Sequence, residues 1–291
     1  MQKVFVILGQ TTTGKSALAV KLAKKINGEI ISADSRQVYT GLNIGSGKVT
    51  KKEMAGVPHH LLDVVSLKKK FSVAEYQKLA NSVITEIIKR GKVPIIVGGT
   101  GFYIDAVTKG IVLPEVPPNP KLRKELEKKS LSQLVTMLKK LDPARVKNID
   151  VKNKVRLIRA IEISKTLGKV PKIKIMKPAY EFVQLGLFLP EKKLRSKIST
   201  RLKSRMTQGM LREAKSLNKN GLSWKRMREL GLEYRFMALH LEGKINKKEM
   251  IEKLEKEIYQ YAKRQMTWFK RDQSIIWFDA SKKISLRKIG V

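Results

Sequence analysis

The sequence predicts an α/β fold: a parallel sheet flanked by helices and interrupted by a mostly helical insertion domain. Over the first 113 residues, short apolar runs alternate with helical patterns, which is typical of such a sheet. A glycine-rich loop joins the first run to the first helix, the arrangement of a P-loop NTPase-like core. From Pro114 the chain becomes basic and helical, and strand-like runs return in its second half.

The glycine-rich loop, which follows the apolar run 4–8, is a predicted phosphate cradle. Gly9 and Gly14 allow the backbone N–H groups to turn inward at a helix N-terminus, which favours anions. Lys15 then reaches phosphate oxygens, and the Ser16 hydroxyl is suited to hold Mg²⁺. The motif indicates a nucleotide or another diphosphate. A helix is predicted to follow from apolar residues at every fourth position, Leu18, Leu22 and Ile26.

A polar segment follows the second predicted strand. Residues 29–33 have a strand pattern that ends at Asp34. In open parallel sheets, ligands bind at the carboxyl ends of the strands, the edge that also carries the P-loop. The segment 34–39 holds a carboxylate, a hydroxyl, a guanidinium, an amide and a phenol. This density of polar groups favours a functional role over a loop that only caps the next element.

Two adjacent histidines follow a glycine- and lysine-rich segment, 41–57, that we expect to be mobile. Neighbouring side chains point in different directions on any regular element, so we interpret His59 and His60 as ordering residues rather than joint metal ligands. The next helix is predicted from an apolar stripe that Gly91 ends. The residues of this stripe are Leu79, Val83, Ile84, Ile87 and Ile88.

The third predicted strand, 93–97, ends in a second glycine-rich segment, 98–101. Gly98 stands where an ATPase is expected to carry its Walker-B aspartate, which weakens an interpretation based on nucleotide hydrolysis. Thr100 is then the natural side chain to face the phosphate cradle. A helix N-cap explains the same threonine equally well, so both roles are open.

A proline-rich segment, 114–120, predicts a linker into the insertion. We expect a P-loop core of residues 1–113 and 182–291, with a helical insertion of residues 114–181. One helix of the insertion is predicted to be amphipathic, with a basic face of Lys152, Arg156 and Arg159 opposite a core face of Val155, Ile158 and Ile161. The basic face fits a solvated surface and a phosphate-binding surface equally well.

Beyond the insertion, the runs 182–189 and 275–278 predict two further strands. Helices that carry several arginines are expected between them. The segment 259–271 is the densest mixture of basic and aromatic residues in the chain, and such mixtures are typical of single-stranded RNA recognition. Some of its aromatic residues must be core, because residues 251, 254 and 258 lead into it as an amphipathic helix.

The composition favours a globular protein that binds a polyanion. The formal net charge is +37, which favours nucleic acid. The excess is mostly lysine, and AT-biased codon usage is an alternative explanation that requires no RNA binding, although the charge favours nucleic acid. The absence of cysteine excludes disulfides, thiolate zinc sites and cysteine nucleophiles. The N-terminus begins directly with a strand pattern and no apolar run is long enough for a bilayer, so we expect a cytoplasmic protein that does not bind membranes.

Six motifs, in order, resemble those of the bacterial tRNA dimethylallyltransferases, also called tRNA isopentenyltransferases, over nearly the whole chain. They are the P-loop 9–16 and the segments 34–39, 58–61, 97–101, 156–162 and 262–269. The resemblance implies transfer of a dimethylallyl group from dimethylallyl diphosphate to the exocyclic N6 amine of the adenosine 3′-adjacent to the tRNA anticodon. It implies Mg²⁺ as cofactor, the anticodon stem-loop of tRNA as partner, and a monomer.

The resemblance also implies roles for individual residues. Asp34 would be the general base, Thr100 would help the leaving group depart, and Lys15 would stabilise the departing diphosphate, with Ser16 at the metal. The implied diphosphate-binding residues are Gly9, Gln10, Thr11, Thr12, Thr13, Gly14, Lys15, Ser16 and Arg201. The implied tRNA-binding residues are Asp34, Ser35, Arg36, Gln37, Thr100, Arg123, Arg156, Arg159, Arg228, Lys263, Arg264 and Gln265.

The chain departs from the family pattern at three positions. Gln10 replaces a common proline, which we expect to be harmless, and Asn43 replaces a common aspartate. Lys197 falls where relatives place arginine, so either Lys197 or Arg201 completes the diphosphate site. Three other functions are open: an adenylate isopentenyltransferase acting on free AMP or ADP, a P-loop small-molecule kinase and an RNA-binding GTPase. The last lacks its guanine-reading motif, because 246–249 is only a near match.

Overall fold

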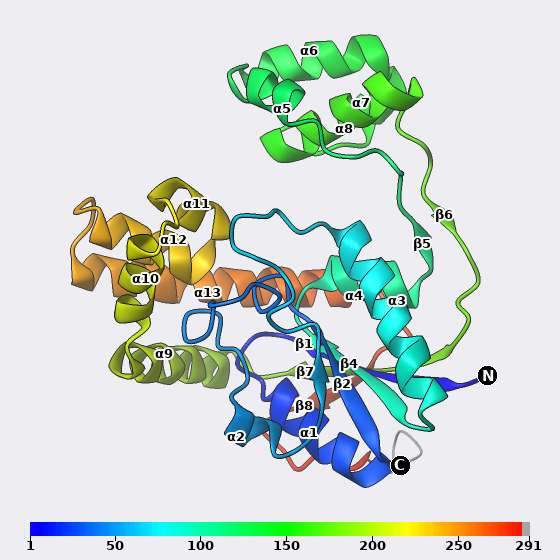
Figure 1. The fold of residues 1–291 in the computed structure, drawn as a ribbon, viewed down its shortest axis with the longest axis vertical. Helices are drawn as coiled ribbons and strands as arrows, with labels where there is room; N and C mark the ends of the chain where they lie inside the picture. Colours follow the sequence, from blue (N-terminus) through cyan, green and yellow to red (C-terminus); the bar gives the residue numbers. More distant parts are fainter. Residues whose placement is uncertain (287–291) are drawn as a thin grey trace. The chain divides into compact units, whose positions relative to one another are not determined.

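The computed structural model describes residues 1–286, and its chain divides into two compact units, 1–109 with 177–291 and 110–176. The predicted insertion, 114–181, begins and ends a few residues later than the smaller unit. The last predicted core residues, 287–291, lie outside the described residues. Each unit is described separately, and Figure 1 labels the elements.

A six-stranded parallel sheet forms the centre of the larger unit, with strand order β3-β2-β4-β1-β7-β8. The predicted strands and their parallel sheet are confirmed; the two-residue edge strand β3 was not predicted. The strands are β1 (Lys3–Gly9), β2 (Gly28–Ala33), β3 (His59–His60), β4 (Val93–Gly98), β7 (Glu181–Phe188) and β8 (Ile276–Asp279).

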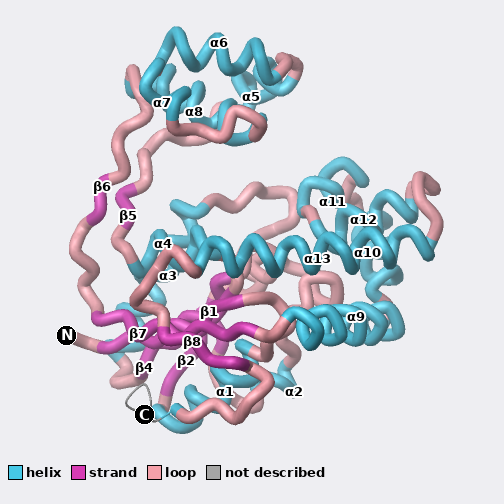
Figure 2. Tube along the Cα trace, turned by 180° about the vertical axis from the view of Figure 1, so that it is seen from behind, coloured by secondary structure: helices cyan, strands magenta, loops and turns pink. Residues whose placement is uncertain are grey.

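Helices cover both faces of this sheet (Figure 1, Figure 2). Phe5 and Ile7 of β1 pack towards α1 (Lys15–Ile26). Val4, Val6 and Leu8 alternate with them and pack on the opposite face, against α3 (Val73–Lys89) and α4 (Gly101–Thr108). Since successive residues of a strand point to opposite faces, an all-apolar strand is buried on both sides. The burial of β1 on both faces therefore places it in the interior of the larger unit.

A second hydrophobic core holds the helices of the C-terminal half together with the loop that contains Val38 and Leu42. Tyr234 is among its fully buried residues. The helices are α9 (Glu191–Gln208), α10 (Met210–Lys219), α11 (Trp224–Leu230), α12 (Leu232–Leu241) and α13 (Lys247–Phe269). The segment 41–57, expected to be mobile, contains α2 (Lys51–Met54) and a hydrogen-bonded turn.

The smaller unit is mostly helical, as predicted from its pattern. Leu134, Leu138, Leu157 and Ile161 form its core. Its helices are α5 (Pro120–Glu127), α6 (Leu131–Leu141), α7 (Pro143–Lys147) and α8 (Lys154–Leu167). The antiparallel strands β5 (Ile111–Val112) and β6 (Lys174–Ile175) complete the unit, and no sequence pattern indicated these two-residue strands.

The predicted basic helix face in this unit is partly wrong. Asn153 is the N-cap of α8, so Lys152 lies in the preceding turn and not on the helix. Val155, placed on the core face by the sequence, is 76% exposed. The core face is formed by Leu157, Ile158 and Ile161 instead. The prediction failed because the helix begins two residues after Lys152, and its first turn projects beyond the core.

Candidate active site

The glycine-rich loop has the strand-loop-helix geometry of a P-loop. β1 ends at Gly9, with φ of 129°, and α1 begins at Lys15 after Gly14, with φ of 87°. A Cβ at Gly9 would lie 2.1 Å from the carbonyl oxygen of Leu187, so no other residue fits. Glycine is therefore required at this position, both for the positive φ of the turn and for the close approach of the loop to β7.

Within the loop, the carbonyl oxygen of Gln10 holds two side chains. It accepts hydrogen bonds from Thr13 Oγ1 at 2.8 Å and from Lys15 Nζ at 2.6 Å. Burial, followed by the nearby Arg201 guanidinium, lowers the pKa of Lys15 to about 7, and Asp34 offsets only part of this effect. An anion in the cradle would reverse the shift, because it favours the charged form of the lysine.

The loop opens into a cavity of about 570 Å³ at the carboxyl edge of the sheet. Lys15, Ser16 and Asp34 line this cavity together with Arg201 of α9. Lys197 is exposed and is not among the lining residues, so Arg201 is the cation that the fold brings to the P-loop. Six of the nine predicted diphosphate residues and the predicted base therefore share one cavity, whereas Gly9, Gln10 and Thr13 are not among its lining residues.

Arg201 is held in the cavity by the loop that follows β2. Its Nη2 donates to the carbonyl oxygen of Gly47 at 3.4 Å. Burial and then the neighbouring Arg205 lower the pKa of Arg201 to about 10, so the guanidinium remains charged near neutral pH. A buried charge with few carboxylate partners favours an anionic ligand.

Asp34 follows β2 directly and organises the turn after it. Its Oδ1 accepts from the backbone N–H groups of Arg36 at 2.8 Å and Gln37 at 3.3 Å. Within residues 1–286, Oδ2 has no hydrogen-bond partner. One oxygen thus fixes the turn, and the carboxylate still lines the cavity.

Thr100 occupies the N-cap position of α4, but its side chain makes no capping hydrogen bond. Its Oγ1 instead accepts from the backbone N–H of Ser35 at 3.0 Å. The hydroxyl therefore connects the end of β4 to the end of β2, next to Asp34, although Thr100 is not among the lining residues of the cavity.

Gln265 and Tyr261, both on α13, close one side of the cavity. Gln265 is buried, and its amide spans two loops: Oε1 accepts from Thr11 N at 2.8 Å and Nε2 donates to Gly99 O at 2.9 Å. Both amide atoms are thus used within the protein. Tyr261 was not predicted as a site residue, although its spacing of four from Gln265 places both on one helix face. Burial raises the pKa of its phenol.

Gln10 contributes its side chain as well as its backbone to the P-loop. It is buried, and its Oε1 accepts from Leu189 N at 3.2 Å. Its own N–H donates to Leu187 O at 3.3 Å. The side chain therefore ties the P-loop to the residue that follows β7.

The other predicted tRNA-binding residues of the larger unit lie in different surroundings. Arg36 donates to Ser35 O and Gln37 to Gly47 O, next to the cavity. Arg228 pairs with Glu242. Lys263 and Arg264 are exposed on α13, with Arg264 3.9 Å from Glu257.

In the smaller unit, two of the three predicted arginines pair with a buried carboxylate. Arg123 donates to Glu162 at 2.7 Å and 2.9 Å, and Arg159 donates to it at 2.6 Å. Burial alone raises the pKa of Glu162, but these bonds and that from Asn119 N outweigh it and lower the pKa. Only Arg156 projects as an exposed side chain.

The adjacent histidines order the edge of the sheet. His60 Nε2 lies 2.7 Å from Glu29 Oε2, and Arg90 and Lys92 pair with the same carboxylate. Burial raises the pKa of Glu29, but the three hydrogen bonds outweigh it and bring the pKa to about 2. His59 contacts Val57 O at 2.8 Å instead, so the two rings have separate partners.

A family model for IPP transferases matches residues 37–272, more than half of the chain. The chain belongs to the IPP transferase family. A tRNA dimethylallyltransferase 2 from Citrifermentans bemidjiense is 41% identical over 271 residues, which cover 93% of this chain and 87% of that protein. The P-loop lies before the matched range of the family model, so its assignment rests also on the geometry above.

Two solved structures in the IPP transferase family have the same fold. The tRNA isopentenylpyrophosphate transferase from Bacillus halodurans gives a TM-score of 0.74 at 37% identity, covering 99% of this chain and 93% of that chain. A eukaryotic dimethylallyltransferase described as acting on tRNA gives a TM-score of 0.80 at 27% identity, covering 96% and 74%. None of the helices in the described part of the chain has the length and apolar composition to span a membrane.

Proposed function

We propose that this protein transfers the dimethylallyl group of dimethylallyl diphosphate to the N6 amine of the adenosine 3′-adjacent to the tRNA anticodon, releasing diphosphate. The observation that carries the proposal is the shared cavity. It brings the P-loop Lys15 and Arg201 together with Asp34, a carboxylate suited to receive a proton. The similarity to tRNA-modifying relatives supports tRNA as the acceptor.

The proposed reaction forms a bond between the adenine N6 and the allylic C1, and it breaks the bond between C1 and the diphosphate oxygen. The electrons of the broken bond leave with the diphosphate, where Lys15, Arg201 and the P-loop N–H groups stabilise the developing charge. The N6 proton passes to the Asp34 carboxylate. Thr100 is proposed to act near the leaving oxygen, through its position beside Ser35.

The residues at the cradle fit a magnesium ion. Ser16 is exposed at the start of α1 and lines the cavity, which also contains the carboxylates of Asp34 and Glu53. Mg²⁺ in proteins takes few side-chain ligands and completes its shell with water and substrate phosphate oxygens. We assign Ser16 to this ion. When bound, it would neutralise charge on the diphosphate.

The structure disfavours ordinary nucleotide hydrolysis at this P-loop. A Cβ at Gly98 would lie 2.1 Å from Ala33 O, so an aspartate does not fit where a Walker-B carboxylate is expected. The near match to a guanine-binding motif, 246–249, is the N-cap of α13: the side chains of Asn246 and Glu249 form its capping box. Both observations favour a diphosphate donor that is not hydrolysed.

One assay separates the proposed function from its alternatives. The protein is incubated with Mg²⁺, labelled dimethylallyl diphosphate and either bulk tRNA or AMP. We expect label in tRNA, on the N6 of the adenosine that follows the anticodon. Label in AMP alone would indicate an adenylate isopentenyltransferase, and the absence of transfer to either acceptor would contradict the proposal.

A further inference from the structure

A single carboxylate holds the loop that borders the cavity. Glu213, in the first turn of α10, accepts three backbone N–H groups: Asn43 at 3.1 Å, Ile44 at 2.7 Å and Gly45 at 3.0 Å. The hydroxyl of Tyr234 donates to it at 2.8 Å. Each carboxylate oxygen thus accepts two bonds, an arrangement that only an ionised side chain supplies.

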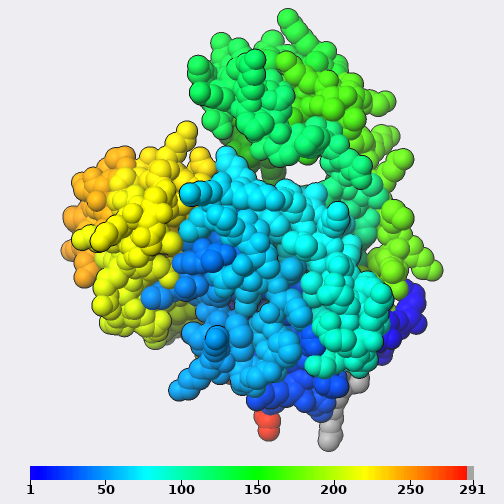
Figure 3. Space-filling view, viewed as in Figure 1, coloured from blue at the N-terminus to red at the C-terminus, as the bar shows by residue number. Residues whose placement is uncertain are grey.

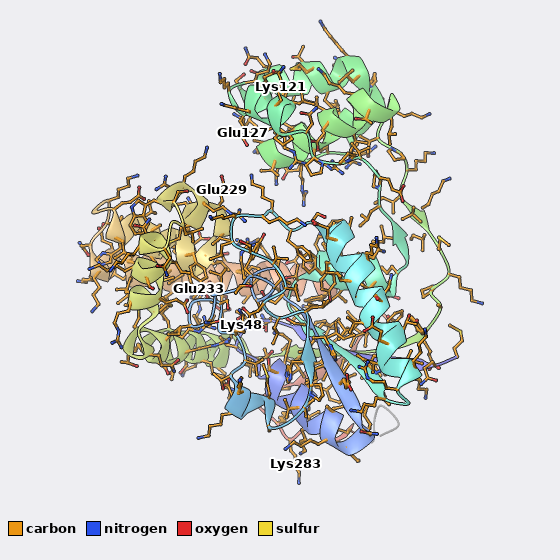
Figure 4. The ribbon with its side chains drawn as sticks, in the orientation of Figure 1. Lys48, Lys121, Glu127, Glu229, Glu233 and Lys283 are labelled. Atoms are coloured by element: carbon orange, nitrogen blue, oxygen red, sulfur yellow. The ribbon has the colours of Figure 1, made fainter. Side chains whose placement is uncertain are left out.

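The same loop, residues 43–47, carries the carbonyl oxygens that orient two arginines of α9. Gly47 O accepts from Arg201 Nη2, and Gly45 O accepts from Arg205 Nη1, both at 3.4 Å. Arg205 also forms an ion pair with Glu233, with 3.0 Å between Arg205 Nη1 and Glu233 Oε1. Glu233 is labelled in Figure 4. Gly47 itself lines the cavity with Arg201, whereas Glu213 is not among the lining residues.

Close packing leaves the loop little freedom to move by itself. A Cβ at Gly45 would lie 2.6 Å from the ring of Tyr234, and one at Gly47 would lie 1.6 Å from Arg205 Nη2. Burial raises the pKa of Tyr234, so its hydroxyl remains a donor to Glu213. Figure 3 shows blue segments of the N-terminal part of the chain at the surface beside the yellow helices of the C-terminal half.

We infer that Glu213 is a positioning residue for the diphosphate site. The carboxylate of Glu213 binds the backbone N–H groups of the turn 43–47. The turn, held in this position, orients the guanidinium of Arg201 towards the P-loop. The inference rests on the proposed function, because it assigns Arg201 to the donor's diphosphate. It gives a role to an acidic residue on α10 that no sequence motif indicated.

Binding of inorganic pyrophosphate with Mg²⁺, measured by calorimetry, tests this inference without tRNA. Glu213→Gln leaves one acceptor oxygen where the loop and Tyr234 require two. We expect about tenfold weaker pyrophosphate binding, and faster hydrogen exchange at the amides of residues 43–45. Glu249→Gln is the matched control, because it removes a carboxylate that caps α13 at an exposed site. It is expected to bind pyrophosphate as the wild type does.

A double-mutant cycle with Arg201→Ala separates positioning from general loss of stability. If Glu213 acts through Arg201, the double variant binds pyrophosphate no more weakly than Arg201→Ala alone. Additive losses, or wild-type binding by Glu213→Gln, would overturn the inference while leaving the proposed function intact. A wild-type protein that does not bind pyrophosphate would overturn both.

Discussion

Gln265 donates to Gly99 at the end of β4 and accepts from Thr11 in the P-loop, 254 positions away. Its buried amide therefore joins the donor cradle to the strand edge that carries Thr100. From this geometry we expect Gln265 to act at the donor site, whereas family likeness alone implies a tRNA contact.

The first prediction concerns this amide. Gln265→Leu removes the hydrogen-bond partners of Thr11 N and Gly99 O, and the unpaired buried Gly99 O costs about 1–3 kcal/mol. We expect a raised KM for dimethylallyl diphosphate and an unchanged KM for tRNA. Steady-state kinetics with each substrate varied in turn measures both. An effect confined to the KM for tRNA would return Gln265 to the RNA-binding surface.

The second prediction concerns Lys15. With a pKa of about 7 in the free protein, Lys15 becomes neutral above that pH, whereas bound diphosphate favours its charged form. Binding above pH 7 must therefore take up a proton, and affinity is expected to fall as pH rises, by up to about tenfold per unit. Calorimetric titration with pyrophosphate from about pH 6 to about pH 9 measures this slope.

Lys15→Met is the control for the titration, because any slope that remains belongs to pyrophosphate itself. The same variant, like Lys15→Ala, should abolish transfer, since the charge that neutralises the leaving group inside the loop is lost. Equal slopes in the wild type and the variant would show that Lys15 does not titrate on binding. Transfer at the wild-type rate would refute the P-loop assignment.

The third prediction separates the arginines of the smaller unit. Arg156 is exposed, so Arg156→Ala should weaken tRNA binding and reduce its salt slope by about 0.7–0.9 per lost phosphate contact. Arg159→Ala should instead lower stability, by about 1–3 kcal/mol, because buried Glu162 loses a charged donor. Thermal unfolding and salt-dependent binding of both variants measure the two effects. Identical behaviour of the two variants would contradict this division.

The sequence predicted the strands that carry the site because each is a continuous apolar run ended by a polar or glycine-rich segment. The segments that follow those strands contain Lys15, Ser16, Asp34 and Thr100. Hydrogen bonds between a loop and a helix far away in the sequence leave no local sequence pattern. Glu213 on α10 meets the loop 43–47 and Gln265 on α13 meets the P-loop only through tertiary packing, so no spacing along the chain indicates what they contact.

Predictions from the sequence failed where they depended on very short strands or on the exact residue at which a helix begins. The position of Lys152 depended on whether α8 begins before or after Asn153, and the asparagine side chain caps the helix there. The two-residue strands β3, β5 and β6 have too few residues for a periodic pattern. Lys197 and Arg201 lie four residues apart on one face of α9, so the choice between them depended on which turn of the helix lies beside the P-loop, and residue spacing does not show this.

The central claim is that Asp34 accepts the N6 proton at the P-loop cavity, and the rate of transfer by Asp34→Asn tests it most directly. Asparagine retains the Oδ1 acceptor for the N–H groups of Arg36 and Gln37, so the turn survives while the basicity is lost. With both substrates saturating, single-turnover transfer to tRNA should slow by roughly 10² to 10⁴, and added Mg²⁺ should not restore it. A rate close to that of the wild type, or recovery at high Mg²⁺ with weakened donor binding, would contradict the role of Asp34 as the base.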